Sequence, residues 1–517
     1  MKTLTLILLA FALVANSQLN ELRLVGQYYG EAAEDHFGLA TTFGDFDNDG
    51  CEEMLIGASG WDDYGKNYFY DWDGSWPTDP AFTFQGMIEG YSYDDVDMNL
   101  GDINGDGIDD FGLVDYVFNF VDPSRLDIFY GATDLDTLPD WSMWSDGPIH
   151  NFGTSLDSCG DVNGDGGNDF IMHILDPSDE FRGFQIYFGG NVLDTIPDWE
   201  YPSDYFDCSG LGDVNGDSFG DVMLLSFAGG PPLLFFGGSP MDTIPDLVFY
   251  NFAAGGVGGG VGDVNGDGYN DFCMPMRFPD STLSRDALYF GGPDVDNTPD
   301  VLLLNIFGVI YPSLRSIASG DFNGDGFSDI VTTPGLPGTN SVHVYLGSAW
   351  FNPSPDVYIN ESVMHDFGST ISSGDLNGDG CDELLITHGD YPWFNQGMCD
   401  LYTGPEEWID FGAGVEPGKL PHTPGWYKLD QNYPNPFNAT TTIHFELGKA
   451  SIISLVIYDL QGEKVKELIK PKEMIPGGYN VSWTGKNKVE QPVSSGIYLL
   501  ELRVDDYREV RKMVLVR

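Results

Sequence analysis

Short apolar runs recur at a regular spacing along most of the chain, and turns rich in glycine, proline and aspartate separate them. Each repeated unit spans about 55 residues and contains four such runs. Apolar runs of this length between turn residues predict β-strands. Four short strands per unit, repeated along the chain, are typical of β-propeller blades. The pattern therefore predicts an all-β fold with one blade per unit.

An acidic loop follows the first strand of every unit. The pattern G-D-x-[DN]-x-D-G-x-x-[DE] occurs seven times. The fourth copy departs from it at one position, where Ser218 replaces the second glycine. The first aspartates of the copies are Asp45, Asp102, Asp161, Asp213, Asp263, Asp321 and Asp375. Seven copies predict a seven-bladed β-propeller.

The two ends of the repeat region predict how the ring closes. Third strands end in an aromatic-glycine turn such as 129–131, and an Asp-Thr-Leu/Ile-Pro-Asp turn follows in several units. The seventh unit stops after its third strand, near Gly404, whereas the run 22–28 is in register with the fourth strands of other units. We therefore expect the N-terminal strand to complete the last blade, which removes a free sheet edge.

The acidic loops have the chemistry of calcium sites. Positions 1, 3, 5 and 9 offer side-chain oxygens, position 7 offers its carbonyl, and hard oxygen donors without His or Cys select Ca²⁺. The predicted ligands are Asp45, Asp47, Asp49, Glu53; Asp102, Asn104, Asp106, Asp110; Asp161, Asn163, Asp165, Asp169; Asp213, Asn215, Asp217, Asp221; Asp263, Asn265, Asp267, Asp271; Asp321, Asn323, Asp325, Asp329; and Asp375, Asn377, Asp379, Glu383. The sequence thus predicts up to seven structural Ca²⁺ ions, the alternative being solvated acidic turns.

Two helical calcium motifs share the opening of this pattern. EF-hands and dockerins need an acidic residue at position 12 and a helix after it. Position 12 is apolar or Thr in every copy, for example Ile56 and Ile386, and it falls in a predicted strand. The sites are therefore predicted to be β-hairpin loops. The fourth loop is expected to be the weakest, because position 6 needs a left-handed backbone that Gly adopts more easily than Ser218.

The charge of the chain is very uneven. The formal net charge is -59, with 22 Lys and Arg against 81 Asp and Glu. Residues 427–517 carry a net charge of +2, so the remainder carries -61. Such an acidic body excludes nucleic acid and anionic membranes as partners through bulk electrostatics. The break predicts a propeller over 18–411, a linker over 412–426 and a separate C-terminal domain over 427–517.

The N-terminus predicts export. Lys2, the apolar run 4–14 and the small residues Ala15 and Ser17 are typical of a signal peptide covering 1–17. The run is too short to span a bilayer comfortably, so a transmembrane anchor is the weaker alternative. Six cysteines in an exported chain permit disulfides. Cys381 and Cys399 are the first pair to test, at the ends of neighbouring predicted strands, and free buried thiols are the alternative.

The repeats resemble a known family. The seven loops, with Phe37-Gly38, Phe152-Gly153 and Phe367-Gly368 ahead of three of them, are similar to the FG-GAP repeats of integrin α-subunit propellers and to VCBS-type repeats. The resemblance covers about residues 20–411. Gly57-Ala58-Ser59 comes nearest to the Gly-Ala-Pro half of the signature, so the resemblance implies a relative of the module rather than an integrin.

The C-terminal domain predicts a small β-sandwich. Its alternating strands are 441–446, 453–458, 479–483, 496–503 and 512–516. The opening 431–438 (QNYPNPFN), Ser495-Gly496-Ile497-Tyr498 and the closing 511–514 resemble the type A C-terminal sorting domain of the bacterial type IX secretion system. The resemblance implies that residues 427–517 engage that machinery, in a Bacteroidota-type bacterium, and that the protein is secreted or held on the outer-membrane surface. A carbohydrate-binding or Ig-like accessory domain is the alternative.

The function predicted from these features is adhesion or recognition. The sequence contains no nucleophile elbow, zinc-protease motif, phosphate loop or dinucleotide fingerprint, so we predict no catalytic residues and no enzyme. Aromatic residues in the loops opposite the calcium hairpins suit a glycan or protein ligand, unless they pack onto their own blades. These candidates are Trp61, Tyr64, Tyr391, Trp393 and Phe394. A polysaccharide-degrading enzyme and a structural surface-layer component are the alternatives.

Overall fold

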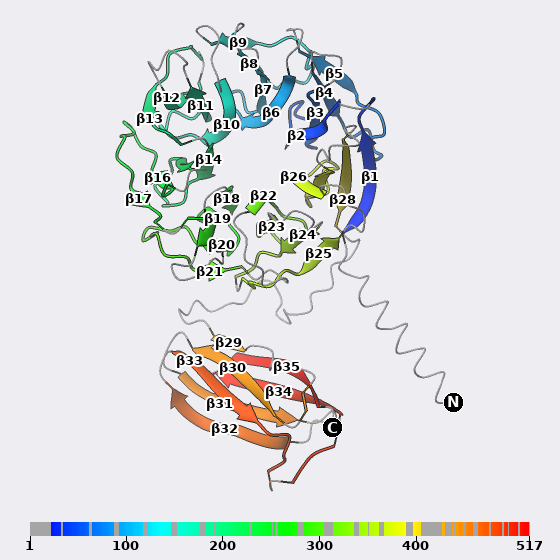
Figure 1. Ribbon diagram of the computed structural model, residues 1–517, viewed down its shortest axis with the longest axis vertical. Helices are drawn as coiled ribbons and strands as arrows, with labels where there is room; N and C mark the ends of the chain where they lie inside the picture. Colours follow the sequence, from blue (N-terminus) through cyan, green and yellow to red (C-terminus); the bar gives the residue numbers. More distant parts are fainter. Residues whose placement is uncertain are drawn as a thin grey trace, which may run out of the picture. The chain divides into compact units, whose positions relative to one another are not determined.

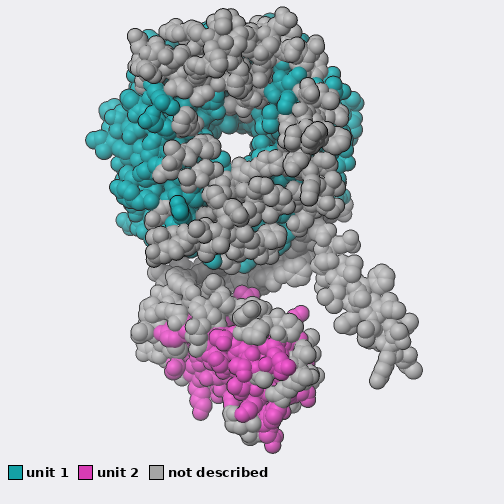
Figure 2. Space-filling model, viewed as in Figure 1, with its two compact units in different colours: residues 1–410 teal, residues 411–517 magenta. Residues whose placement is uncertain are grey.

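The computed structural model describes residues 22–404 and 427–515, with short gaps. The gaps are 33–34, 61–64, 87–91, 117–122, 146–151, 176–181, 191–192, 206, 227–229, 251, 254–256, 278–283, 304–313, 335–340, 350, 361–366 and 389–396 in the first range, and 430–436, 439, 448–450, 459–463, 475–476, 489–490, 495 and 505–506 in the second. The chain divides into two compact units, 1–410 and 411–517 (Figure 2). No helix of the described residues is long and apolar enough to cross a membrane. The predicted signal peptide 1–17 and linker 412–426 lie outside these residues.

The first unit contains seven four-stranded antiparallel sheets. The first four are β2 (Phe37–Gly44), β3 (Glu53–Ala58), β4 (Lys66–Tyr70), β5 (Phe82–Gln85); β6 (Ser92–Gly101), β7 (Asp110–Tyr116), β8 (Arg125–Phe129), β9 (Trp141–Trp144); β10 (Phe152–Gly160), β11 (Asp169–Leu175), β12 (Arg182–Tyr187), β13 (Trp199–Pro202); and β14 (Asp207–Gly212), β15 (Asp221–Leu225), β16 (Leu233–Phe235), β17 (Leu247–Val248). Within each sheet the strands pair in sequence order.

The remaining three sheets complete a ring (Figure 1). They are β18 (Gly259–Gly262), β19 (Asp271–Arg277), β20 (Ser284–Tyr289), β21 (Val301–Leu302); β22 (Leu314–Gly320), β23 (Asp329–Pro334), β24 (Ser341–Tyr345), β25 (Val357–Asn360); and β26 (Phe367–Gly374), β27 (Glu383–His388), β28 (Met398–Thr403) with β1 (Arg23–Tyr29). The first strands of neighbouring sheets contact each other around the ring, including β26 with β2. Figure 2 shows an opening through its middle. The arrangement is consistent with a seven-bladed propeller.

The N-terminal strand closes the last sheet, as predicted. β1 pairs antiparallel with β28, so that Gln27 lies opposite Asp400 and Tyr28 lies opposite Cys399. The sheet order is therefore β1-β28-β27-β26. Because strands from both ends of the repeat region share one sheet, neither β1 nor β28 can leave without exposing backbone hydrogen bonds.

The apolar core is divided among the junctions between blades. Seven clusters of buried residues each combine side chains from two neighbouring sheets. At the first junction, Phe46 and Phe84 pack with Phe111 and Phe129, whose rings stack with centroids 4.9 Å apart. Each blade therefore depends on its neighbours for burial of its apolar residues.

The cysteines correct one prediction. Cys399 lies opposite Thr387 in the pairing of β27 with β28, whereas Cys381 comes six residues before Thr387, in the loop that precedes β27. Six residues of extended chain span about 20 Å. A disulfide needs Cα atoms within about 7 Å of each other, so these two cysteines cannot pair. All six cysteines are free thiols: Cys51, Cys159, Cys208, Cys273, Cys381 and Cys399.

The second unit contains two sheets that share one apolar core. One consists of β29 (Tyr427–Leu429), β30 (Thr441–Leu447) and β33 (Gly477–Trp483); the other of β32 (Lys464–Met474), β31 (Ser451–Tyr458), β34 (Gly496–Val504) and β35 (Tyr507–Leu515). Trp483 from the first sheet packs against Tyr498 from the second, with ring centroids 5.3 Å apart. The predicted strands are all present, and the sequence patterns missed β29 and β32.

Candidate metal centres

All seven acidic loops connect the first and second strands of their sheets, which confirms their predicted place in the repeat. Because the sheets share one strand order, the loops occupy equivalent positions around the ring. The 28 residues predicted as ligands all belong to the described part of the chain. Their geometry can therefore be compared from one blade to the next.

The aspartate at position 1 folds each loop around its own carboxylate. In the first loop, Asp45 accepts hydrogen bonds from the N–H groups of Asp49 (3.1 Å) and Gly50 (3.2 Å). The other six loops repeat this pair of contacts. Position 6 is left-handed, with φ of 90° at Gly50 and 74° at Ser218. The predicted backbone requirement at Ser218 is confirmed.

The acidic residue at position 9 clamps the loop to the blade. In the second loop, Asp110 accepts hydrogen bonds from the N–H groups of Ile103 (2.9 Å) and Gly131 (2.8 Å). Ile103, at position 2, is buried between the blades. Burial raises the pKa of Asp110 to about 7, although these two N–H groups act to lower it. In this loop the carboxylate that would face a cation also holds the hairpin in place.

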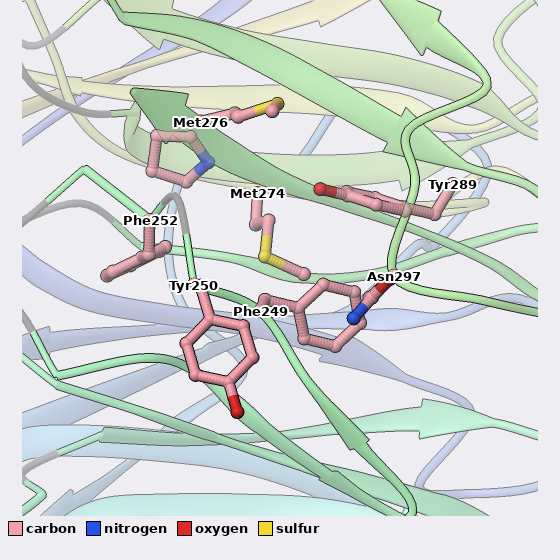
Figure 3. A pocket seen from close by; sticks show the side chains of 8 residues that line it. Phe249, Tyr250, Phe252, Met274, Met276, Tyr289 and Asn297 are labelled. Atoms are coloured by element: carbon pink, nitrogen blue, oxygen red, sulfur yellow. The ribbon is translucent and has the colours of Figure 1, made fainter. Parts of the chain in front are cut away.

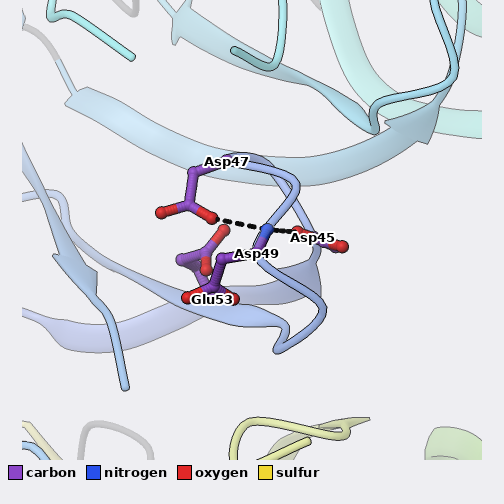
Figure 4. A group of neighbouring side chains, drawn as sticks. All are labelled: Asp45, Asp47, Asp49 and Glu53. Atoms are coloured by element: carbon purple, nitrogen blue, oxygen red, sulfur yellow. Dashed lines mark hydrogen bonds between the residues drawn. The ribbon is translucent and has the colours of Figure 1, made fainter. Parts of the chain in front are cut away.

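The first loop gathers the largest negative charge. One carboxylate oxygen from each of Asp45, Asp47, Asp49 and Glu53 lies within 4.8 Å of the others, and Figure 4 shows the four side chains grouped at the hairpin. Glu53 is fully buried, and its Oε1 accepts no hydrogen bond from the described residues. Burial, reinforced by the charge of Asp47, raises the pKa of Glu53 to about 9. Four converging carboxylates, one of which has a buried oxygen without a donor, fit a Ca²⁺ ion.

The other six loops have Asn at position 3, and in most of them its amide donates a hydrogen bond to a carboxylate of the same loop. Asn163 donates its amide N–H to Asp165 (3.2 Å), and Asn377 donates to Glu383 (3.0 Å). Asn215 and Asn323 make the equivalent contact to position 5. An amide at this position carries one negative charge fewer than the carboxylate of the first loop. These loops therefore offer the same donors to a cation at lower charge.

Neighbouring loops are hydrogen-bonded to each other. The N–H at position 8 donates to the carbonyl oxygen at position 1 of the preceding loop, as in Glu52 to Asp375 (2.9 Å) and Asn168 to Asp102 (2.8 Å). The same contact joins Gly220 to Asp161, Asn270 to Asp213, Ser328 to Asp263 and Asp382 to Asp321. A change in the backbone of one loop is therefore transmitted directly to the next blade.

Other candidate features of the sequence are buried, apolar or outside the described residues. Trp61, Tyr64, Tyr391, Trp393 and Phe394 lie outside the described residues. His173, His343 and His388 are buried, so none of the three is exposed to a substrate.

Figure 3 shows a small pocket beside β19, and apolar residues make up most of its lining. These residues include Phe249, Tyr250, Phe252, Met274, Met276 and Tyr289, with the polar side chain of Asn297.

Two family models match segments of the sequence. Residues 321–386, which contain the sixth and seventh acidic loops, match the FG-GAP-like repeat. Residues 431–516 match the secretion system C-terminal sorting domain. The chain carries an FG-GAP-like repeat and a type IX secretion C-terminal sorting domain. The sorting domain marks this protein as secreted or displayed on the cell surface of a Bacteroidota-type bacterium, and it implies an interaction with the secretion machinery.

Comparison with solved structures gives matches of low sequence identity. Two crystal structures of BBS1N in complex with ARL6DN, soaked with mercury and with lead, match with TM-scores of 0.44 and 0.41. Each match has 10% identity and covers 75% of this chain and 98% of the other. The search of curated proteins found no match to this chain.

Proposed function

We propose that this FG-GAP protein is a calcium-stabilised recognition module that binds an extracellular glycan or protein after export by type IX secretion. The observation that carries the calcium part is the cluster of Asp45, Asp47, Asp49 and Glu53, with its buried oxygen that lacks a donor. The equivalent loops of the other six blades are the further candidate sites. The first and last loops, which meet where the ring closes, would support the closure itself.

Calcium offsets a destabilising concentration of charge. Three or four carboxylates in each loop repel one another, and burial of the residue at position 9 adds a desolvation cost. A divalent cation removes both effects at once. Sites of this extracellular kind bind Ca²⁺ with dissociation constants of about 10⁻⁴–10⁻³ M. The ions would therefore be bound outside the cell and lost in a chelator.

The recognition part is supported by rigidly held apolar side chains at one edge of the blades. Leu138, Ile196 and Ile244 occupy equivalent turns of three consecutive blades and are 67%, 70% and 71% exposed. Each turn is fixed by its first aspartate, as in the hydrogen bond of 2.7 Å from the Leu138 N–H to Asp136. Large apolar side chains presented on ordered turns suit burial against a partner.

The proposal is tested by binding of the calcium-loaded, full-length chain to an array of extracellular glycans and matrix proteins. We expect specific binding that is lost in EDTA and weakened when Leu138, Ile196 and Ile244 are replaced together by Ser. Matched replacement of Thr137, Thr195 and Thr243 by Ser keeps the turns and controls for local disturbance. Absence of binding across the array would contradict recognition and favour a structural surface component. Release of sugars from an arrayed polysaccharide would instead favour the enzyme.

A further inference from the structure

Glu53 and Asp71 occupy facing positions at the first loop. In the antiparallel pairing of β3 with β4, Met54 lies opposite Tyr70. Continued by one residue, this register places Asp71 opposite Glu53. Directly opposed residues of an antiparallel pair project to the same face, with Cβ atoms about 5 Å apart. The acidic residue at position 9 of the first loop therefore faces a second carboxylate from the end of β4.

The seventh blade shows that this position reaches the loop. Its register places Leu384 opposite Tyr402, so Thr403 is the residue equivalent to Asp71 and Glu383 is equivalent to Glu53. There the Thr403 hydroxyl donates a hydrogen bond of 2.7 Å to Oε1 of Glu383. Blades two to six have Tyr, Phe or Leu at this position: Tyr130, Phe188, Phe236, Phe290 and Leu346. Only the first blade places an acid there.

The same blade lacks the backbone donor that its neighbours provide. In blades two to six the next residue is a glycine whose N–H donates to the position-9 aspartate. The equivalent residue in the first blade is Trp72. Glu53 Oε1 and Asp71 Oδ1 are both buried, and neither accepts a hydrogen bond from the described residues.

Two facing carboxylates with oxygens that lack donors are stabilised by a positive charge between or beside them, and without one the pair must take up a proton. We infer that Asp71 is a fifth acidic ligand of the cation held by Asp45, Asp47, Asp49 and Glu53, and that it makes the first site the tightest of the seven. The inference rests on the proposed calcium binding and adds a ligand from outside the loop. Affinity of oxygen-ligated Ca²⁺ sites rises with the number of charged ligands, so a fifth carboxylate sets this blade apart.

Terbium luminescence of the full-length chain tests the added ligand directly. Tb³⁺ replaces Ca²⁺ at oxygen sites, and Trp72, which lies in edge contact with Trp76 at 4.9 Å, is placed beside the first loop to sensitise it. Emission that is lost in Trp72→Phe is assigned to this site. We expect Asp71→Ala, which removes the side-chain oxygens altogether, to weaken Ca²⁺ competition at this site about tenfold or more, and to add about one bound water to its Tb³⁺, measured from lifetimes in H₂O and D₂O.

Asp73→Ala is the matched control. It removes the same charge two residues further along, from an exposed side chain that accepts a hydrogen bond of 2.8 Å from the Ser75 hydroxyl. We expect this variant to keep both the affinity and the number of bound waters. If Asp71→Ala weakens binding and leaves the number of bound waters unchanged, Asp71 acts only through its negative charge, without contacting the cation, and the inference is wrong.

The seventh blade allows the converse experiment. Thr403→Asp places a carboxylate opposite Glu383 and recreates the pair of the first blade. We expect the variant to melt at a lower temperature than the parent in EDTA. Added Ca²⁺ should then raise the melting temperature of the variant by more than it raises that of the parent. A variant that is destabilised equally in EDTA and in Ca²⁺ would contradict the ligand role. Absence of any Ca²⁺ effect in the parent protein would instead overturn the proposed calcium binding itself.

Discussion

Gln27 in β1 donates a hydrogen bond of 2.9 Å to Asp400 in β28, joining residues 373 positions apart. On its other side, Asp400 lies 3.0 Å from His388 Nε2 in β27. The buried carboxylate thus ties together three strands of the sheet that closes the ring. Backbone pairing of β1 with β28 aligns the strands, and this polar contact fixes the register.

Removal of the Gln27 amide is expected to weaken the ring closure. Gln27→Ala leaves one oxygen of the buried Asp400 without its donor, which costs about 1–3 kcal/mol. The measurement is the free energy of unfolding in calcium, by denaturant titration. Leu24→Thr, at an exposed position of the same strand, is the control and should have little effect. Equal destabilisation by both variants would show that strand propensity, rather than the Asp400 contact, is being measured.

Ser218→Gly is expected to stabilise the fourth blade. Ser218 has φ of 74°, a left-handed conformation that costs a residue with a side chain about 1–2 kcal/mol. The equivalent glycines have open space around the position of a Cβ, so the cost at Ser218 lies in the backbone and not in a clash. Gly268→Ser in the fifth loop should lose a similar amount. Ser218→Gly should raise the free energy of unfolding and Gly268→Ser should lower it. If the two variants change it in the same direction, this explanation is refuted.

His343 is expected to make stability depend on pH. Burial lowers its pKa to about 4, below the value of about 6.5 in the unfolded chain. Between these values the unfolded state binds more protons, so the free energy of unfolding falls as the pH falls from about 6.5 to about 4, by about 3 kcal/mol in full. In His343→Gln this component of the pH dependence should disappear. A difference between variant and parent that stays constant from pH 4 to 7 would contradict it.

The repeated loops were predictable because their spacing carries both the fold and the chemistry. Asp45 and its six counterparts mark one hairpin per blade, and Ser218 marks the one departure from glycine. The closure by β1 was also predictable, because the seventh unit lacks a fourth strand. The loops need only local sequence, since each occupies one position within a repeat, whereas the closure follows from comparing the last unit with the others.

The pairing of individual residues across strands was harder to predict from the sequence, because it depends on the register of the strands. The Cys381–Cys399 prediction was wrong since the two residues sit six positions out of register along β27 and β28. The role inferred for Asp71 depends on the same kind of information. Its one sequence signal is that the first unit has Tyr70-Asp71-Trp72 where the others have Tyr, Phe, Leu or Thr followed by glycine. The strand β32 was missed because lysines and glutamates interrupt its alternation.

Calorimetric melting of the full-length chain in calcium and in EDTA, at matched ionic strength, tests the central claim most directly. With free Ca²⁺ at ten times its dissociation constant, each occupied site adds about 1.4 kcal/mol to the stability of the folded state. The account predicts a large increase in melting temperature with Ca²⁺ at millimolar concentration and its reversal by EDTA. An identical melting temperature in both conditions would show that the acidic hairpins hold the ring without a cation, and would contradict the account.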